Sequence, residues 1–140
     1  METQGIRPHS DMRDLSLRIR GGLTIQLIRL DLENQTSGSA DTCVARLTGK
    51  LSLETVHYFL CMVRSEPASY LLLDLSGVSF LDSAGVGALV SLFISRRRAG
   101  KGLALVALAL QGIAVLQVSG LIRLLPLYAS VDLAIRQFRI

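Results

Sequence analysis

The stretch "VSFLDSAGVGALVSLF", residues 78–93, decides the fold. Its apolar run stops at the polar and small residues "DSAG" (82–85), and apolar residues then return at helical spacing. This pattern predicts a strand that turns directly into a helix over residues 83–100, with Asp82 or Ser83 as the N-cap. Three roles are open to Ser83 at this point: a catalytic nucleophile, a helix cap, or a hydroxyl that another enzyme modifies.

The segments on either side of this turn alternate between strand and helix patterns. In chain order the predicted elements are strands at 23–34 and 42–49, a helix at 52–67, a strand at 70–75, a helix at 83–100, a strand at 103–109, a helix at 111–120, a strand at 121–128 and a helix at 130–138. The order ββαβαβαβα predicts a single α/β domain. We expect a mixed, mainly parallel sheet with an N-terminal hairpin, covered by helices.

The domain is assigned to residues 23–138. Residues 1–22 are polar, contain Pro8 and end in Gly-Gly, so we expect a flexible N-terminal tail. Within the domain, Ser52 is the predicted N-cap of the helix at 52–67, whose apolar face begins at Leu53.

The composition is that of one globular domain without a concentrated basic patch. The chain has 140 residues, of which 50% are hydrophobic and 19% charged, and its formal net charge is +4. The densest cationic cluster, Arg96 to Arg98, falls at the end of a predicted helix, where cations interact favourably with the helix dipole. We therefore expect no nucleic-acid partner.

No segment has the length of a membrane span. The longest apolar run, "LALVALAL" (103–110), is far shorter than the roughly 18–20 residues needed to cross a bilayer. The N-terminus lacks the apolar core of a secretion signal. We therefore expect a cytoplasmic protein without direct membrane insertion. Cys43 and Cys61 lie in apolar contexts without CxxC spacing, which predicts buried free thiols and no metal site.

The surroundings of Ser83 do not match those of a catalytic serine. A hydrolase elbow has a glycine two residues before the serine, where this chain has Leu81. The two histidines of the chain are His9, in the predicted tail, and His57, in a predicted helix, and nothing places either beside Ser83. The sequence therefore predicts no nucleophilic catalysis.

Motifs for phosphate and cofactor binding are also incomplete. "TGKLS" (48–52) lacks the upstream glycine of a P-loop, and "GVGALV" (85–90) lacks the last glycine of the dinucleotide fingerprint. A paired acid and base from Asp74 and Asp82 has no further support in the sequence. We predict that the protein is not an enzyme and takes no cofactor, although a small enzyme or nucleotide-binding protein that uses Asp82 and Ser83 is a competing hypothesis.

The remaining two roles of Ser83 are compatible. A hydroxyl at a helix N-terminus lies beside free backbone N–H groups and the positive end of the helix dipole. A phosphate there adds roughly −1.5 to −2 charges, which the helix N-terminus tolerates. On a packed surface, such a charge acts on partner binding rather than on folding.

These residues resemble a known family. The segment "LLLDLSGVSFLDSAGVGALVSLFISRRRAGKGLALVAL" (71–108) is similar to the central segment of STAS domains, specifically of anti-sigma factor antagonists. It has the buried strand ending in Asp-Leu, the turn with Phe, Asp, Ser and Gly, the amphipathic helix, the Gly-rich bend and the apolar strand. "VLQVSGLIRLLPLYASVDLAI" (115–135) resembles the family's C-terminal segment.

The resemblance implies a function for Ser83. In such proteins this serine is phosphorylated by an anti-sigma factor with serine kinase activity, and only the unphosphorylated protein binds that factor and releases the sigma factor. The implied partner surface comprises the ridge from Ser83 to Gly87 and the loop at 49–55. The residues assigned to it are Asp82, Ser83, Ala84, Gly85, Gly87, Lys50, Ser52 and Thr55. A homodimer is left open.

The chain departs from the family in this loop, and a second function stays open. Where the family often has "G-E-L-D", this chain reads "GKLSLET" (49–55), so Lys50 and Ser52 replace two acids. The alternative function is a STAS scaffold subunit of a lipid-transport ATPase or signalling complex, in which Ser83 is structural and no phosphate switch operates.

Overall fold

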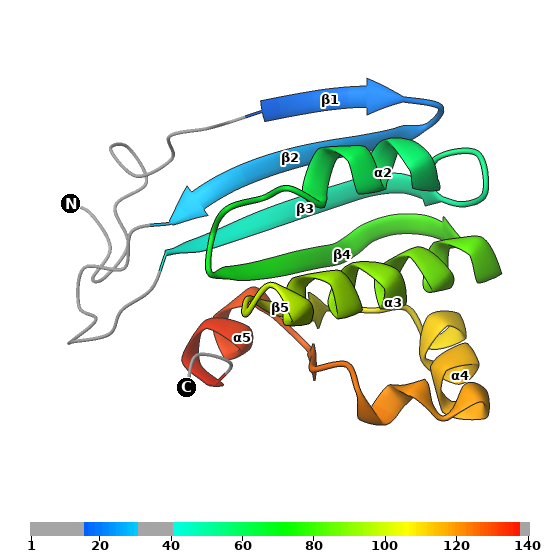
Figure 1. The fold of residues 1–140 in the computed structure, drawn as a ribbon. Helices are drawn as coiled ribbons and strands as arrows, with labels where there is room; N and C mark the ends of the chain where they lie inside the picture. The colour runs from blue at the N-terminus through cyan, green and yellow to red at the C-terminus, as the bar shows by residue number, and fades with distance from the viewer. Residues whose placement is uncertain (1–15, 31–40, 138–140) are drawn as a thin grey trace.

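The computed structural model describes residues 16–30 and 41–137, which form an α/β domain (Figure 1). Its elements are β1 (Ser16–Arg20), β2 (Leu23–Leu30), β3 (Thr42–Leu51), α2 (Val56–Val63), β4 (Tyr70–Leu81), α3 (Ser83–Arg98), β5 (Gly102–Val106), α4 (Leu110–Ser119), the 3-10 helix η1 (Leu121–Arg123), β6 (Leu127–Tyr128) and α5 (Val131–Gln137).

The strands form one six-stranded sheet in sequence order, β1 to β6. The pairs β1–β2 and β2–β3 are antiparallel, whereas β3–β4, β4–β5 and β5–β6 are parallel. The predicted single α/β domain with a mixed sheet is therefore confirmed. The sheet has one strand more than predicted, β1, at its N-terminal edge.

That additional strand, β1, lies inside the segment predicted to be a flexible tail. Residues 16–20 pair with β2 through a turn at Gly21 and Gly22, whose φ angles are +60° and +90°. Two successive positive φ angles are the geometry of a type I′ hairpin turn, which glycine adopts without steric cost. The prediction of a tail is therefore wrong for residues 16–20, and residues 1–15 lie outside the described residues.

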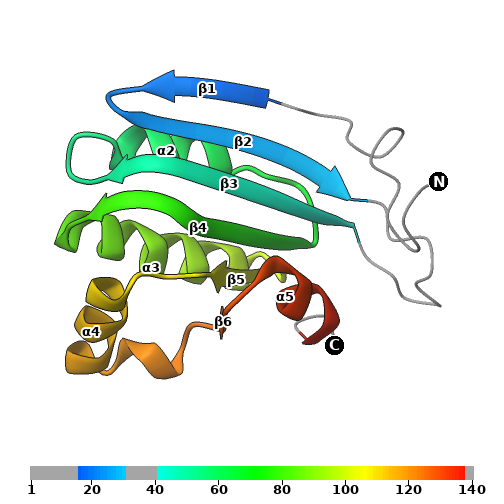
Figure 2. The same cartoon turned by 180° about the vertical axis from the view of Figure 1, so that it is seen from behind.

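Helices cover the two faces of the sheet unequally. Figures 1 and 2 show α2, α3 and α4 on one face and α5 on the other. The larger core lies under α2 and α3, where Phe59, Leu89 and Leu92 pack against alternate residues of the strands. The smaller core lies under α5 and includes Leu72 and Ala134. Residues 71–75 of β4 are thus buried on both faces, as the continuous apolar run in this part of the strand predicts.

Several predicted boundaries move for identifiable reasons. The helix predicted from residue 52 begins only at Val56, because residues 52–55 form a turn. Strand β4 continues to Leu81 instead of ending at residue 75. The strand predicted at 121–128 is reduced to its last two residues, because Gly120 adopts φ +78° and a 3-10 turn follows.

The C-terminal end of α3 is anchored by a buried arginine. Arg96 is 2% exposed, and its guanidinium donates to the carbonyl oxygens of Glu66, Ala68 and Gly102 at 3.1, 2.6 and 2.8 Å. Burial lowers the pKa of Arg96, against the raising effect of Glu66. The prediction that residues 96–98 simply complement the helix dipole is therefore wrong for Arg96, which ties three backbone segments together.

The two cysteines differ in environment. Cys43 is buried in β3, as predicted, whereas Cys61 is exposed on α2. The prediction of a buried thiol is therefore wrong for Cys61, because the apolar side of the short helix faces the sheet through Phe59 and Val63 instead.

Candidate functional site

Asp82 joins the start of α3 to the loop that follows β3. One carboxylate oxygen, Oδ1, accepts the Gly85 N–H at 2.8 Å, which is the N-cap bond of the helix. The other, Oδ2, accepts the Leu53 N–H at 3.1 Å. Mainly because of the Gly85 N–H, and with a further contribution from Leu53, the pKa of Asp82 lies below its ordinary value. Of the two predicted caps, Asp82 is therefore the N-cap of α3.

Gly85 allows α3 to begin this close to β3. The residue is buried, and an added Cβ would overlap the Leu51 carbonyl oxygen and lie 2.8 Å from the Leu81 side chain. The backbone N–H of Asp82 also points to the Leu51 oxygen, at 3.4 Å. Glycine is therefore required here by the close approach of two backbone segments.

Ser83 and Gly87 lie one turn apart on the outer side of the same helix. Both are exposed, and Ala84 between them is half-buried. An added Cβ on Gly87 would meet nothing within 4 Å, so packing within the described residues does not require this glycine. Of the predicted surface residues in this segment, Asp82 and Gly85 therefore serve the fold, whereas Ser83 and Gly87 face outward.

The loop residues assigned to the same surface also fall into an exposed group and a buried group. Lys50 is exposed, but Ser52 is 7% exposed and Thr55 is fully buried. The Thr55 hydroxyl accepts the Ser52 N–H at 3.0 Å and donates to the Lys50 carbonyl at 2.8 Å, so it shapes the turn from inside. Thr55, not Ser52, therefore organises the start of α2.

A cavity of about 470 Å³ lies between this loop and the end of β4. It is lined by Lys50, Ser52, Leu53, Glu54, Ser79, Phe80 and Asp82. The structure therefore places Lys50 and Ser52 close to Asp82, although the two residues lie about thirty positions before Asp82 in the chain. Lys50 and Glu54 place one positive and one negative charge at the edge of this cavity.

Two exposed apolar side chains beside Asp82 were not assigned as site residues: Leu53, within the implied loop at 49–55, and Phe80, outside the implied surface. Leu53 is 73% exposed and Phe80 is 47% exposed. Helical spacing placed Leu53 on the apolar face of a helix, which is wrong because the residue precedes α2 and its N–H is held by Asp82. Ser79 and Phe80 are successive residues and both are exposed, so the alternation of a half-buried strand does not hold at the end of β4.

Helix α4 completes this edge of the sheet. The Gln111 side chain donates to the Leu81 carbonyl at 2.9 Å, so the start of α4 lies against the end of β4. Leu110, beside it, is 82% exposed. In Figure 1 the starts of α2 and α3 and the whole of α4 lie toward the same end of the sheet. Ligand sites in open α/β sheets lie at this end, where parallel strands finish.

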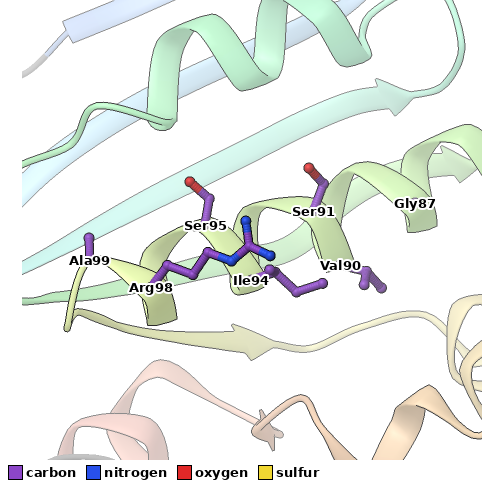
Figure 3. A pocket seen from close by; sticks show the side chains of 7 residues that line it. All are labelled: Gly87, Val90, Ser91, Ile94, Ser95, Arg98 and Ala99. Atoms are coloured by element: carbon purple, nitrogen blue, oxygen red, sulfur yellow. The ribbon is translucent and has the colours of Figure 1, made fainter.

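A second cavity, of about 660 Å³, follows the outer surface of α3 (Figure 3). It begins at Gly87 and is otherwise lined by Val90, Ser91, Ile94, Ser95, Arg98 and Ala99. Figure 3 shows the Ser91 and Ser95 side chains pointing the same way, toward α2. The lining contains one charged group and no carboxylate, thiol or imidazole, so it offers no acid–base pair.

The two carboxylates considered as an acid–base pair have separate partners. Asp74 accepts the Ser76 N–H at 3.0 Å and the Arg46 Nε–H at 3.2 Å. Burial raises the pKa of Asp74, but the bonds from Ser76 and Arg46 outweigh it, and the pKa lies below its ordinary value. Both Asp74 and Asp82 are thus stabilised as carboxylates, which does not suit a general acid.

Within residues 16–30 and 41–137, no three His, Cys, Asp or Glu side chains gather as a set of metal ligands. Over the same residues, no helix combines the length and the apolar character that spanning a bilayer requires.

Comparison with known proteins places this geometry in a family. The sequence model of the STAS domain matches residues 32–134, well over half of the chain. The chain belongs to the STAS domain family. This match includes β3, α3 and the whole of the site around Asp82 and Ser83. No curated protein sequence matches the chain.

Solved structures show the same STAS fold at low sequence identity. An anti-sigma factor antagonist from Mycobacterium paratuberculosis has a TM-score of 0.62 at 22% identity, covering 84% of this chain and 95% of that one. The Bacillus cell fate determinant SpoIIAA, in its phosphorylated form, has 0.57 at 23%, covering 82% and 99%. A sulfate transporter family protein from Wolinella succinogenes has 0.54 at 19%, covering 64% and 77%.

Proposed function

We propose that this STAS domain is an anti-sigma factor antagonist whose binding to an anti-sigma factor with serine kinase activity is switched off by phosphorylation of Ser83. It is a non-enzymatic regulator of transcription that acts in the cytoplasm. The observation that carries the proposal is the exposure of Ser83 at the first position of α3, where Asp82 already provides the cap.

The fold accepts a phosphate on Ser83 because the hydroxyl is not used to hold the helix. The Asp82 carboxylate binds the Gly85 N–H, and Ser83 lies on the outer side. A phosphate at a helix N-terminus is favoured by the dipole. Phosphorylation is therefore expected to leave the domain folded, in keeping with its use as a reversible signal.

The partner is expected to cover Ser83 together with the apolar side chains of Leu53 and Phe80. Buried apolar anchors surrounded by polar groups are the usual centres of protein interfaces. A phosphate of roughly −1.5 to −2 charges within such an interface must be desolvated and lies next to the Asp82 carboxylate. The cost of several kcal/mol corresponds to a loss of affinity of roughly a hundredfold or more.

The test uses the full chain, ATP and a candidate anti-sigma factor kinase from the same organism. We expect a mass increase of one phosphate in the unaltered chain and in Ser91→Ala, a matched control at another exposed serine of α3. Ser83→Ala is expected to stay unmodified and to bind the kinase. Ser83→Asp is expected to fold normally and to bind roughly a hundredfold more weakly.

Two results would overturn this proposal. In the first, phosphate is added to Ser83→Ala as readily as to the unaltered chain. In the second, Ser83→Asp binds the kinase as tightly as the unaltered chain, which would instead support the STAS scaffold without a phosphate switch.

A further inference from the structure

A histidine and a cysteine meet on the outer face of α2, away from Asp82 and Ser83. His57 and Cys61 are both exposed and lie four residues apart, so they share one side of the helix. The His57 Nε2 and Cys61 Sγ atoms are 3.6 Å apart. Together with Leu60, Arg64 and Ser65, these two residues line a cavity of about 400 Å³.

This distance is the one that a zinc ion imposes on two of its ligands. Zn–S bonds of about 2.3 Å and Zn–N bonds of about 2.0–2.1 Å at a tetrahedral angle hold sulfur and nitrogen about 3.5 Å apart. The two side chains therefore have the required spacing without any change in the helix. Thiolate and imidazole are also the donors that zinc prefers in structural sites.

A tetrahedral zinc site would need two ligands besides this pair. Structural zinc sites use four protein ligands, and the described residues place no third His, Cys, Asp or Glu in a group with these two. Because both side chains point outward from a short helix, a second copy of the chain related by a two-fold axis would supply the same pair again. Two such pairs would together give a Cys₂His₂ ligand set.

We propose that His57 and Cys61 bind a Zn²⁺ ion that is shared by two copies of this chain through their α2 helices. Each Cys61 thiol releases its proton to solvent as its sulfur binds the metal, so two thiolates balance the charge of the ion. The Arg64 side chains that line the same cavity then adjoin a neutral centre rather than an uncompensated dication.

The test titrates the full chain with Co²⁺, a spectroscopic substitute for Zn²⁺, in the presence of a phosphine reductant. We expect a thiolate-to-cobalt charge-transfer band that saturates at about one ion per two chains. Sedimentation is expected to show a dimer that forms with the metal and dissociates with a chelator. Zn²⁺ is expected to displace the cobalt and to keep the dimer.

Three variants assign the ligands. Cys61→Ser and His57→Gln are expected to lose the band and the metal-dependent dimer, while Ser65→Ala, at the rim of the same cavity, retains both. Thermal unfolding of the metal-free variants should match that of the unaltered chain, because both substituted side chains are exposed.

Three outcomes would overturn the shared site. They are the absence of the band, a band that survives Cys61→Ser, and saturation at one ion per chain without a dimer. The first would mean that the 3.6 Å contact is only a hydrogen bond between thiol and imidazole. None of these measurements depends on Ser83 or on a kinase, so the two proposals succeed or fail separately.

Discussion

The two ends of α3 are held in opposite ways. At its C-terminal end, the Arg96 side chain is buried and donates hydrogen bonds to three backbone carbonyls from two other segments. At its N-terminal end, one carboxylate, Asp82, holds both the helix and the neighbouring loop. The first end is therefore held by a buried side chain, whereas the second leaves Ser83 facing outward.

The largest effect is expected from Arg96→Leu. The substitution leaves the carbonyls of Glu66, Ala68 and Gly102 without their donor inside the protein, which should lower the free energy of unfolding by about 3–5 kcal/mol. Urea unfolding followed by circular dichroism measures this loss. Arg97→Leu, at the exposed neighbour, should change stability by less than about 0.5 kcal/mol. Equal losses in the two variants would remove the contrast between the two ends.

A smaller effect is expected from Gly85→Ala, because the added methyl group overlaps the Leu51 carbonyl and forces α3 away from β3. We expect a loss of roughly 1–3 kcal/mol. Gly87→Ala, one half-turn further, meets open space and should gain about 0.5–1 kcal/mol from helix propensity. Thermal unfolding of the two variants should thus shift in opposite directions, and a shift in the same direction would contradict the division between inward and outward residues.

The smallest effect is expected from Asp82→Ala, which removes the cap and should cost about 1 kcal/mol at neutral pH. Because the pKa of Asp82 lies below its ordinary value in the folded protein, its contribution is complete above that ordinary value and is lost as the pH falls through the folded pKa. Stability measured across this acidic range should converge for the two proteins. Asp82→Asn, which keeps an oxygen acceptor, should lose less at neutral pH, and a gap that persists in acid would show that the charge plays no part.

The central part of the fold could be predicted from sequence because its signals are local. The apolar run before residue 82, the capping residues and the helical spacing after them all lie within a few turns of each other. Strand β1 carried no comparable signal, because its pairing depends on β2 across the Gly21–Gly22 turn. The same holds for the Thr55 hydroxyl, which sets the start of α2 by bonding to the backbone of the preceding loop.

The candidate site was only partly accessible from the sequence. Asp82, Ser83 and Gly85 could be predicted because they share one short motif. The exposure of Leu53 and Phe80 could not, since apolar residues at regular spacing are ordinarily buried. Buried Arg96 was missed for the converse reason: a charged residue is placed on the surface unless its distant partners are known.

By itself, the sequence determined the alternation of strands and helices, the turn at residues 82–85 and the placement of a serine at the start of a helix, because these depend on neighbours along the chain. Only the tertiary structure decided which groups face inward. It joined Asp82 to Leu53, set Gly85 against Leu51, and left Ser83 at the surface. These contacts join segments about thirty residues apart, and their energies depend on distances that a local pattern does not contain.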